Sequence, residues 1–219
     1  MCPMSQKRND QTKNTFSRLK EQERLTRREI ILDAAERVFA TTPFPEVNMR
    51  NIAREAGISA ASIYTYFPDQ ETLFVEAYLR GSQNILKTFK QRTRKSENPL
   101  GSLIEAYIDY FTSHDVYFRM MAHFMLYARL NPESLEKLNT MERAVLDYFD
   151  TFFENMGYRT NVRFLSHMFF AALNGILISF RKYPGRSEDE VVKHMKRLGD
   201  TFAALLRAGV ESTCNETRP

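Results

Sequence analysis

Residues 59–66 combine small side chains with hydroxyl groups and carry no charge, a composition suited to molecular recognition. The residues concerned are Ser59, Ala60, Ala61, Ser62, Tyr64, Thr65 and Tyr66. Hydroxyl groups hydrogen-bond to the base edges and phosphates of nucleic acid, and an alanine methyl group can contact the methyl group of thymine. We therefore predict contacts to DNA in this segment rather than acid–base catalysis.

Two short helices joined by a tight turn are predicted to position this segment. Asn48 is a favourable N-cap, because its side-chain oxygen can accept a backbone N–H at the start of a helix. Residues 49–56 then place their apolar members on one side of that helix. Gly57 tolerates the left-handed conformation that ends many helices, and Ser59 can cap the next helix. The pattern predicts a helix-turn-helix, whose second helix lies in the major groove of DNA.

A further helix is predicted immediately before this pair. Thr26 and Glu29 have the spacing of a capping box, which predicts a helix start near Arg27. Residues 30–39 repeat apolar side chains at intervals of three and four, as expected of a helix with one buried side. Pro43 is predicted to end the helix.

The segment from residue 30 to residue 74 resembles the TetR family of bacterial one-component transcriptional regulators. The resemblance is carried by Ile30, Leu32, Ala34, Ala35, Phe39, Phe44, Met49, Ile52, Ala53, Ala56, Gly57, Ile58, Ser59, Ile63, Tyr64, Phe67 and Leu73. Three positions depart from the family pattern. Pro43 replaces the usual glycine after the first helix, and Asn48 replaces the usual Thr or Ser. Gln70 replaces a lysine that often contacts the DNA backbone, so one phosphate contact is expected to be weaker or missing.

The resemblance implies a repressor that a small molecule releases from a palindromic double-stranded DNA operator. Together with the chemistry of the residues, it predicts a set of DNA-binding positions. They are Arg28, Asn48, Arg50, Ser59, Ala60, Ala61, Ser62, Tyr64, Thr65, Tyr66 and Gln70. The alternative is a helical interaction protein whose helix-turn-helix no longer binds DNA specifically, to which the replacement at Gln70 is a slight pointer.

The N-terminal residues are strongly basic. Residues 1–28 contain eight Lys or Arg and three acidic residues, although the whole chain has a formal net charge of only +4. Such an arm can contact phosphates or the minor groove. It can equally be a solvated tail, because charge runs often are. Residues 1–25 are predicted to form this arm and to be partly disordered.

The remaining chain predicts an all-α protein of about nine helices. Residues 26–74 would form the three-helix DNA-binding domain, residues 75–210 a ligand-binding and dimerisation domain, and residues 211–219 a flexible tail. A fourth helix is predicted from Asp69 to about Lys95. Later helices are predicted at about 100–113, 116–130, 132–156, 160–181 and 187–208.

The last two predicted helices carry a stripe that suits a dimer interface in a four-helix bundle built from two copies of the chain. The residues assigned to it are Phe164, Met168, Ala171, Ala172, Gly175, Ser179, Phe202, Leu205 and Leu206. The alternative is that the stripe packs entirely within one chain. A homodimer would match a palindromic operator, and the resemblance favours it.

The middle of the chain is rich in Phe, Tyr and Met, which suit an irregular hydrophobic pocket. Five residues are assigned to the pocket, namely Tyr107, Phe111, Met121, Met125 and Asn174. The composition fits an ordinary core equally well. An apolar or aromatic ligand is the corresponding expectation.

Other functional classes receive no support from the sequence. No phosphate-binding glycine loop, nucleophile elbow or paired carboxylates are visible, so we predict neither an enzyme nor a cofactor. The four histidines are scattered, so no metal site is predicted. No signal-peptide core and no run of eighteen apolar residues is seen, so a cytoplasmic protein without a membrane segment is expected.

Overall fold

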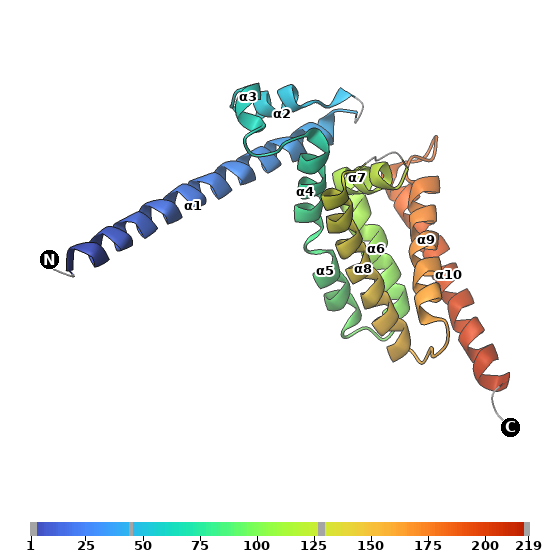
Figure 1. Ribbon diagram of the computed structural model, residues 1–219. Coiled ribbons are helices and arrows are strands. Elements are labelled where there is room, and N and C mark those ends of the chain that lie inside the picture. The colour runs from blue at the N-terminus through green and yellow to red at the C-terminus, as the bar shows by residue number, and fades with distance from the viewer. Residues whose placement is uncertain (1–3, 44–45, 127–129, 217–219) are drawn as a thin grey trace. The chain divides into compact units, whose positions relative to one another are not determined.

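The computed structural model describes residues 4–43, 46–126 and 130–216, with side chains described from residue 15 to residue 208 (Figure 1). Phe44, which contributes to the family resemblance, lies outside the described residues. Every element in the described ranges is a helix. The predicted all-α fold is confirmed.

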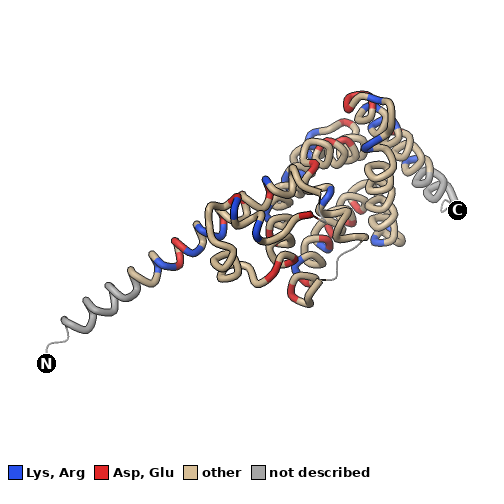
Figure 2. Tube along the Cα trace, turned by 90° about the horizontal axis from the view of Figure 1, so that it is seen from above, with Lys and Arg blue, Asp and Glu red and all other residues tan. Residues whose placement is uncertain are grey.

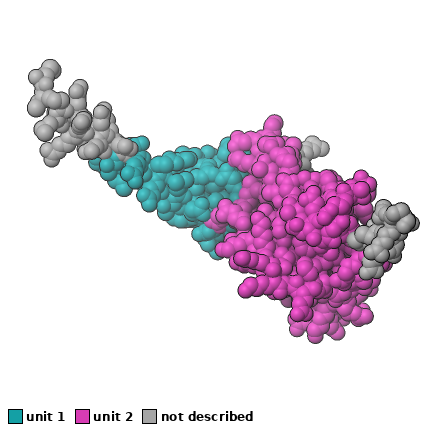
Figure 3. All heavy atoms as spheres, turned by 90° about the horizontal axis from the view of Figure 1, so that it is seen from below, with its two compact units in different colours: residues 1–77 teal, residues 78–219 magenta. Residues whose placement is uncertain are grey.

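The chain divides into two compact units, residues 1–77 and residues 78–219 (Figure 3). The division lies three residues beyond the boundary predicted at residue 74. It falls inside one helix, α4 (Gln70–Ser82), so a single helix supplies residues to both units.

The first helix, α1, extends over Met4–Thr41 and is much longer than predicted. The predicted start near Arg27 is therefore wrong, and the arm assigned to residues 1–25 is helical from Met4 onward. Thr26 lies inside the helix, where its hydroxyl donates to the carbonyl of Gln22 instead of capping a helix start. Residues 1–3 lie outside the described part of the chain.

The core of the first unit joins α1 to α2 (Met49–Glu55), α3 (Ala60–Ile63) and the first part of α4. It consists of buried apolar side chains spaced at helical intervals, as the sequence predicted. The buried residues include Ile31, Ala34, Ala35, Phe39, Ile52, Ala53, Ile63, Phe67, Leu73 and Phe74. The rings of Phe39 and Phe74 meet edge to face, 4.7 Å apart, and so pack α1 against α4.

The predicted helix from Asp69 to Lys95 is broken into two, α4 and α5 (Ile85–Thr93). Asp69 does cap the start of α4, because its Oδ1 accepts the backbone N–H of Thr72 at 2.6 Å. At the other end, the Tyr110 hydroxyl donates to the Gly81 carbonyl at 2.8 Å. This bond satisfies a carbonyl near the end of α4, where the helix itself leaves acceptors unpaired.

The second unit is a helical bundle. In Figure 1, α5, α6 (Pro99–Ser113), α8 (Pro132–Asn155), α9 (Val162–Phe180) and α10 (Glu188–Glu216) run side by side, and α7 (Asp115–Leu126) crosses one end of them. Asn98 and Asn131 cap α6 and α8 through their side-chain oxygens, each followed by a proline at the first helical position.

Aromatic rings fill the core of the bundle. Phe169 is fully buried and contacts the rings of Phe149 and Phe153 at 5.0 and 5.2 Å. At the C-terminal end, α10 continues to Glu216, so most of the tail predicted from residue 211 is helical. Residues 217–219 lie outside the described part.

Candidate DNA-binding surface and ligand cavity

The helix-turn-helix is built by the caps that the sequence predicted. The Asn48 side chain accepts the backbone N–H of Asn51 at 3.0 Å, and the Ser59 hydroxyl accepts that of Ser62 at 3.0 Å. Gly57 has a φ of +70°, in the left-handed region that favours glycine. These contacts fix the angle between α2 and α3 locally.

Most of the predicted recognition residues lie at the surface of the first unit. Ala61, Ser62, Tyr64 and Thr65 are exposed, and the Tyr64 side chain is 53% exposed. Ala60, Tyr66 and Gln70 are half-buried, and the exposed Asn48 and Ser59 use their side-chain oxygens as caps. The Ser62 hydroxyl also lies 2.7 Å from that of Ser59, which leaves both groups partly engaged.

Two arginines lie one helical turn apart on α2. Arg50 and Arg54 are both exposed, and neither forms an ion pair with another residue in the described part of the chain. The sequence reasoning assigned Arg50 to DNA and left Arg54 as a solvent-facing residue. Arg50 and Arg54 are four residues apart, which places both on one side of a helix. This spacing could have identified Arg54 as a second candidate contact.

Arg28 has a different setting from the one predicted. Its guanidinium donates to the Tyr66 carbonyl at 2.6 Å, pairs with Glu76 and stacks over the Phe67 ring with 4.4 Å to the centroid. The side chain is only 20% exposed. Arg28 thus clamps α1 to the end of the recognition segment and to α4, and its donors are engaged within the unit.

The basic character of α1 is partly neutralised by its own acids. Figure 2 shows Lys and Arg interspersed with Asp and Glu along the described side chains of this helix. Arg24 pairs with Glu21 at 2.9 Å, and Arg27 pairs with Glu23 at 2.7 Å. Such pairs support a helix at its surface. Lys7, Arg8 and Lys13, which the arm prediction also used, have side chains outside the described residues.

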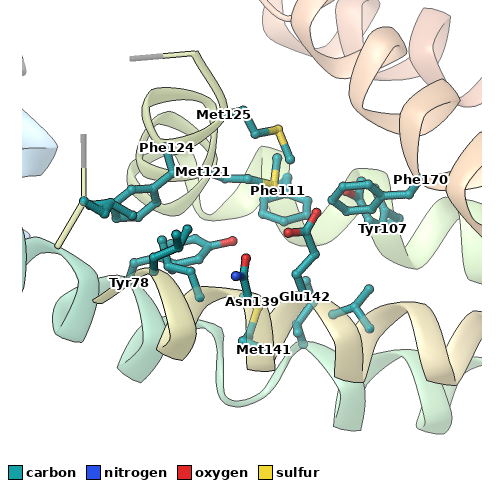
Figure 4. A pocket seen from close by; sticks show the side chains of 15 residues that line it. Tyr78, Tyr107, Phe111, Met121, Phe124, Met125, Asn139, Met141, Glu142 and Phe170 are labelled. Carbon is teal, nitrogen blue, oxygen red and sulfur yellow. The ribbon is translucent and has the colours of Figure 1, made fainter. Parts of the chain in front are cut away.

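The second unit contains a cavity of about 260 Å³, formed by residues from α4 to α9 (Figure 4). Its lining consists of aromatic, thioether and aliphatic side chains with two polar residues, Asn139 and Glu142. The lining residues are Tyr78, Ile85, Tyr107, Phe111, Met121, Phe124, Met125, Leu130, Leu135, Leu138, Asn139, Met141, Glu142, Val145 and Phe170.

Four of the five residues assigned to a pocket line this cavity, namely Tyr107, Phe111, Met121 and Met125. Asn174 does not line it. Its Oδ1 accepts the Tyr107 hydroxyl at 2.9 Å, and its Nδ2 is buried without a hydrogen-bond partner in the described part of the chain. Asn174 therefore orients a residue of the cavity wall.

The tyrosine hydroxyls at the cavity remain protonated. Burial is the main cause that raises the pKa of both Tyr78 and Tyr107, and the negative charge of Glu142 raises both further. Figure 4 shows the Glu142 carboxylate and the Asn139 amide directed into the space between the aromatic rings. The cavity therefore presents neutral phenols, one amide and one carboxylate within a mainly apolar wall.

The contribution of α8 was missed by the sequence reasoning. Leu138, Glu142 and Val145 are spaced as one side of a helix, so an acidic residue interrupts an apolar stripe. This acidic residue in an apolar stripe could have indicated that α8 contributes to the cavity.

Residues 31–77 match the family model for bacterial regulatory proteins of the tetR family. The match covers the end of α1, both helices of the helix-turn-helix and the first part of α4. Residues 31–77 are therefore a TetR-type helix-turn-helix domain. The predicted resemblance is confirmed.

Two curated relatives are described as uncharacterized HTH-type transcriptional regulators. The protein from Haemophilus influenzae is 31% identical over 90 residues, which cover 41% of this chain and 43% of that protein. YhgD from Bacillus subtilis is 23% identical over 139 residues, which cover 60% of this chain and 69% of that protein. The chain thus spans less than half the length of the Haemophilus relative.

Solved structures share the TetR fold at low sequence identity. A TetR-family regulator from Streptomyces coelicolor aligns with a TM-score of 0.65 at 19% identity, covering 85% of this chain and 83% of that chain. FadR from Bacillus subtilis, solved in complex with stearoyl-CoA, aligns with a TM-score of 0.60 at 18% identity, covering 78% of this chain and 95% of that chain.

The stripe predicted for dimerisation is largely exposed. Phe164 is 65% exposed, Met168 49% and Leu205 67%, while a Cβ on Gly175 would meet no atom within 4 Å. Ala171 and Ser179 are also exposed, and Ala172 and Leu206 are half-buried. Ile178, at 50% exposure, extends the stripe and was missed by the sequence reasoning.

Phe202 differs from the other residues of the stripe. It is half-buried, and its ring stacks on that of Phe169 at 6.0 Å inside the bundle. At least one side of the Phe202 ring therefore belongs to the core of its own chain. Only the other side of the Phe202 ring would be available to a second copy of the chain.

By length and composition, α9 is apolar enough to cross a membrane, which the sequence analysis did not anticipate. Its apolar residues fall on two sides. Phe169, Leu173 and Leu177 are buried in the bundle, whereas the stripe of Phe164 and Met168 faces outward. The exposed side is an apolar surface for which a covering partner has to be identified.

Proposed function

We propose that the chain is a dimeric DNA-binding transcriptional regulator, a repressor that a small molecule releases from a palindromic operator. The observation that carries the proposal is a TetR-type helix-turn-helix whose recognition residues are uncharged and mostly exposed, beside two exposed arginines. No acidic residue occurs between Ser59 and Phe67, so nothing in this segment repels a phosphate backbone.

In this proposal, base contacts come from α3 and phosphate contacts from its surroundings. Ser62 and the alanines beside it approach base edges, while Tyr64 and Arg50 bind phosphates. Arg54 joins Arg50 as a second phosphate contact. Whether the N-terminal part of α1 adds minor-groove or phosphate contacts remains a prediction, although the pairing of Arg24 and Arg27 with neighbouring acids lowers its expected share.

The cavity of the second unit is the proposed effector site. Its apolar and aromatic lining supports a small molecule with an apolar or aromatic body. The stearoyl-CoA complex of Bacillus subtilis FadR supports the idea that a protein of this fold can take a small-molecule ligand. Since α4 contributes Tyr78 to the cavity and also belongs to the DNA-binding head, ligand binding can shift the population between DNA-competent and incompetent states.

Dimerisation through α9 and α10 completes the proposal. Two exposed apolar stripes would cover each other across a two-fold axis, and two heads would then face the two halves of a palindrome. The relatives are bacterial regulators, which supports a cytoplasmic location.

The test is binding of the purified full chain to the intergenic DNA beside its own gene, measured by fluorescence anisotropy at several salt concentrations against scrambled DNA. We expect specific binding by a dimer, with Tyr64→Ala and Arg50→Ala each weakening it while circular dichroism stays unchanged. Each lost phosphate contact should reduce the slope of log affinity against log salt by about 0.9. Absence of binding to any fragment would favour the interaction-protein alternative.

A further inference from the structure

Glu142 is an acidic residue within the apolar side of α8. Leu138 precedes it by four residues and Val145 follows it by three, and all three line the cavity. A carboxylate in such a stripe costs solvation free energy unless something favourable faces it. Glu142 is exposed, so this cost is small, but the residue also lines the cavity.

Two other acidic residues of α8 have cationic partners on the same helix. Glu133 pairs with Lys137 at 2.8 Å, and Glu136 pairs with Arg143 at 2.5 Å. Glu142 forms no hydrogen bond or ion pair with any residue in the described part of the chain. Glu142 is thus an acidic residue of α8 that lines the cavity and has no partner in the described part of the chain.

Aromatic rings line the same cavity as the Glu142 carboxylate. Figure 4 shows Glu142 directed toward Phe111 and Tyr107, with Phe170 beside them and Tyr78 across the space. Its charge reaches the hydroxyls of both tyrosines, where it adds to the effect of burial in raising their pKa. Aromatic faces attract cations through their quadrupole, so the rings and the carboxylate favour the same sign of charge.

We propose that the cavity binds a compact organic cation, an amine or quaternary ammonium with an aromatic or aliphatic body. Its positive centre lies between Glu142 and the surrounding rings, and its body lies against the Met and Phe side chains of α7. The proposal rests on the cavity being the effector site.

An acyl-CoA does not match this cavity as it stands. Its phosphates would bring several negative charges toward the Glu142 carboxylate, which is unfavourable at short distance. The volume of about 260 Å³ is also at the small end for ligand sites, which commonly enclose about 300–1,000 Å³. A long thioester would need a larger space than the structure provides.

The test compares three probes that share a phenylbutyl body and differ in charge. Calorimetric titration of the full chain with 4-phenylbutylamine, 4-phenylbutanol and 4-phenylbutyrate at neutral pH gives the affinity for a cation, a neutral molecule and an anion. We expect the amine to bind at least about tenfold more tightly than either of the others, since both a carboxylate and aromatic faces contribute. Equal or tighter binding of the alcohol or the butyrate would overturn the proposal, as would failure of all three to bind.

Two variants test whether Glu142 causes the preference for the amine. Glu142→Gln should weaken amine binding about fivefold, the size expected of an ion pair at a partly exposed site, and leave the alcohol within about twofold. Glu154→Gln removes the same charge from an exposed position of α8 away from the cavity and should change nothing. An unchanged preference in Glu142→Gln would refute the role of the carboxylate.

A third variant tests whether a cation of the chain itself neutralises Glu142. Arg129→Gln removes a cation that is close to Leu130 in sequence and outside the described residues. We expect amine affinity to stay within about twofold, whereas a gain of about tenfold would mean that Glu142 is neutralised within the chain and would overturn the proposal. Because the titrations contain no DNA, failure of operator binding with intact amine selectivity would count against the proposed function alone.

Discussion

Substitution of Arg28 by alanine distinguishes a structural clamp from a DNA contact. The sequence assigned this residue to DNA because it lies in a basic stretch before the helix-turn-helix. In the structure its guanidinium bonds to the Tyr66 carbonyl and to Glu76, and it lies over the Phe67 ring. The variant removes all three contacts at once, so we expect the head to lose stability.

The expected loss follows from the individual contacts. A hydrogen bond from a charged donor to a carbonyl contributes about 1.5–3 kcal/mol, and the lower end applies because the site is partly solvated. Stacking on Phe67 adds about 0.5–1 kcal/mol. The ion pair with Glu76, discounted for solvent screening, adds about 0.5 kcal/mol. Together they give a decrease of about 2–3 kcal/mol in the free energy of unfolding of the first unit.

Thermal unfolding followed by circular dichroism measures the effect. For a chain of this length we expect a decrease in Tm of about 5–10 °C. Arg28→Lys should recover only part of the loss, because an ammonium group cannot reproduce the planar fork that bonds to two acceptors. Arg50→Ala is the matched control. It removes the same charge from an exposed position that has no ion pair with the described residues, and its Tm should stay close to that of the unmodified protein.

The combination of stability and DNA binding decides between the two roles. If Arg28→Ala leaves Tm unchanged while it lowers DNA affinity and the salt slope, as expected for Arg50→Ala, the clamp reasoning is refuted. Arg28 would then be the phosphate contact that the sequence predicted.

Three further outcomes are expected. Phe164→Glu should place a charge in the proposed dimer interface and weaken the dimer at least about hundredfold, as measured by sedimentation velocity. If the unmodified chain instead partitions into vesicles as a monomer, the stripe is a membrane-binding surface and not a dimer interface. Gly199→Ala should lower the free energy of unfolding by about 1–2 kcal/mol in urea, because its Cβ would lie 2.4 Å from the buried Ile104 Cγ2, whereas Gly175→Ala, with open space around its Cβ, should not. Burial raises the pKa of Tyr110 to about 12, above its ordinary value of 10.0, so its contribution to stability is complete below pH 10 and is lost as the pH rises toward 12. A urea midpoint that does not fall over this range, with phenolate absorbance rising before unfolding, would contradict the burial argument.

Local capping was readable from the sequence because it depends on residues three positions apart. Asn48, Ser59 and Asp69 all accept the backbone N–H groups expected of them. The same local pattern gave a wrong prediction at Thr26, where it indicated a helix start. A Thr with a Glu three residues later also fits the interior of a helix, and the pairs within α1 extend that helix far toward the N-terminus.

Contacts between distant residues could not be read in this way. Arg28 meets Tyr66 and Glu76 across 38 and 48 residues, and Tyr110 meets Gly81 across 29. The first gives Arg28, a predicted DNA contact, partners within its own unit, and the second accompanies the break of a predicted helix. Composition predicted the residues of α6 and α7 that line the cavity. It did not show that Glu142 lies beside the aromatic rings, because these residues are far from it in the sequence.

The break after Ser82 makes α4 a short lever. Its 13 residues are about 20 Å long at about 1.5 Å per residue. A tilt of about 10° about its C-terminal end would move its N-terminal end by about 3.4 Å, the axial spacing of one nucleotide along a DNA strand. Without the break, the same tilt would have to carry α5 and the bundle packed around it. A small rearrangement near Tyr78 and Gly81 therefore corresponds, at the other end of α4, to a displacement of one base-pair step.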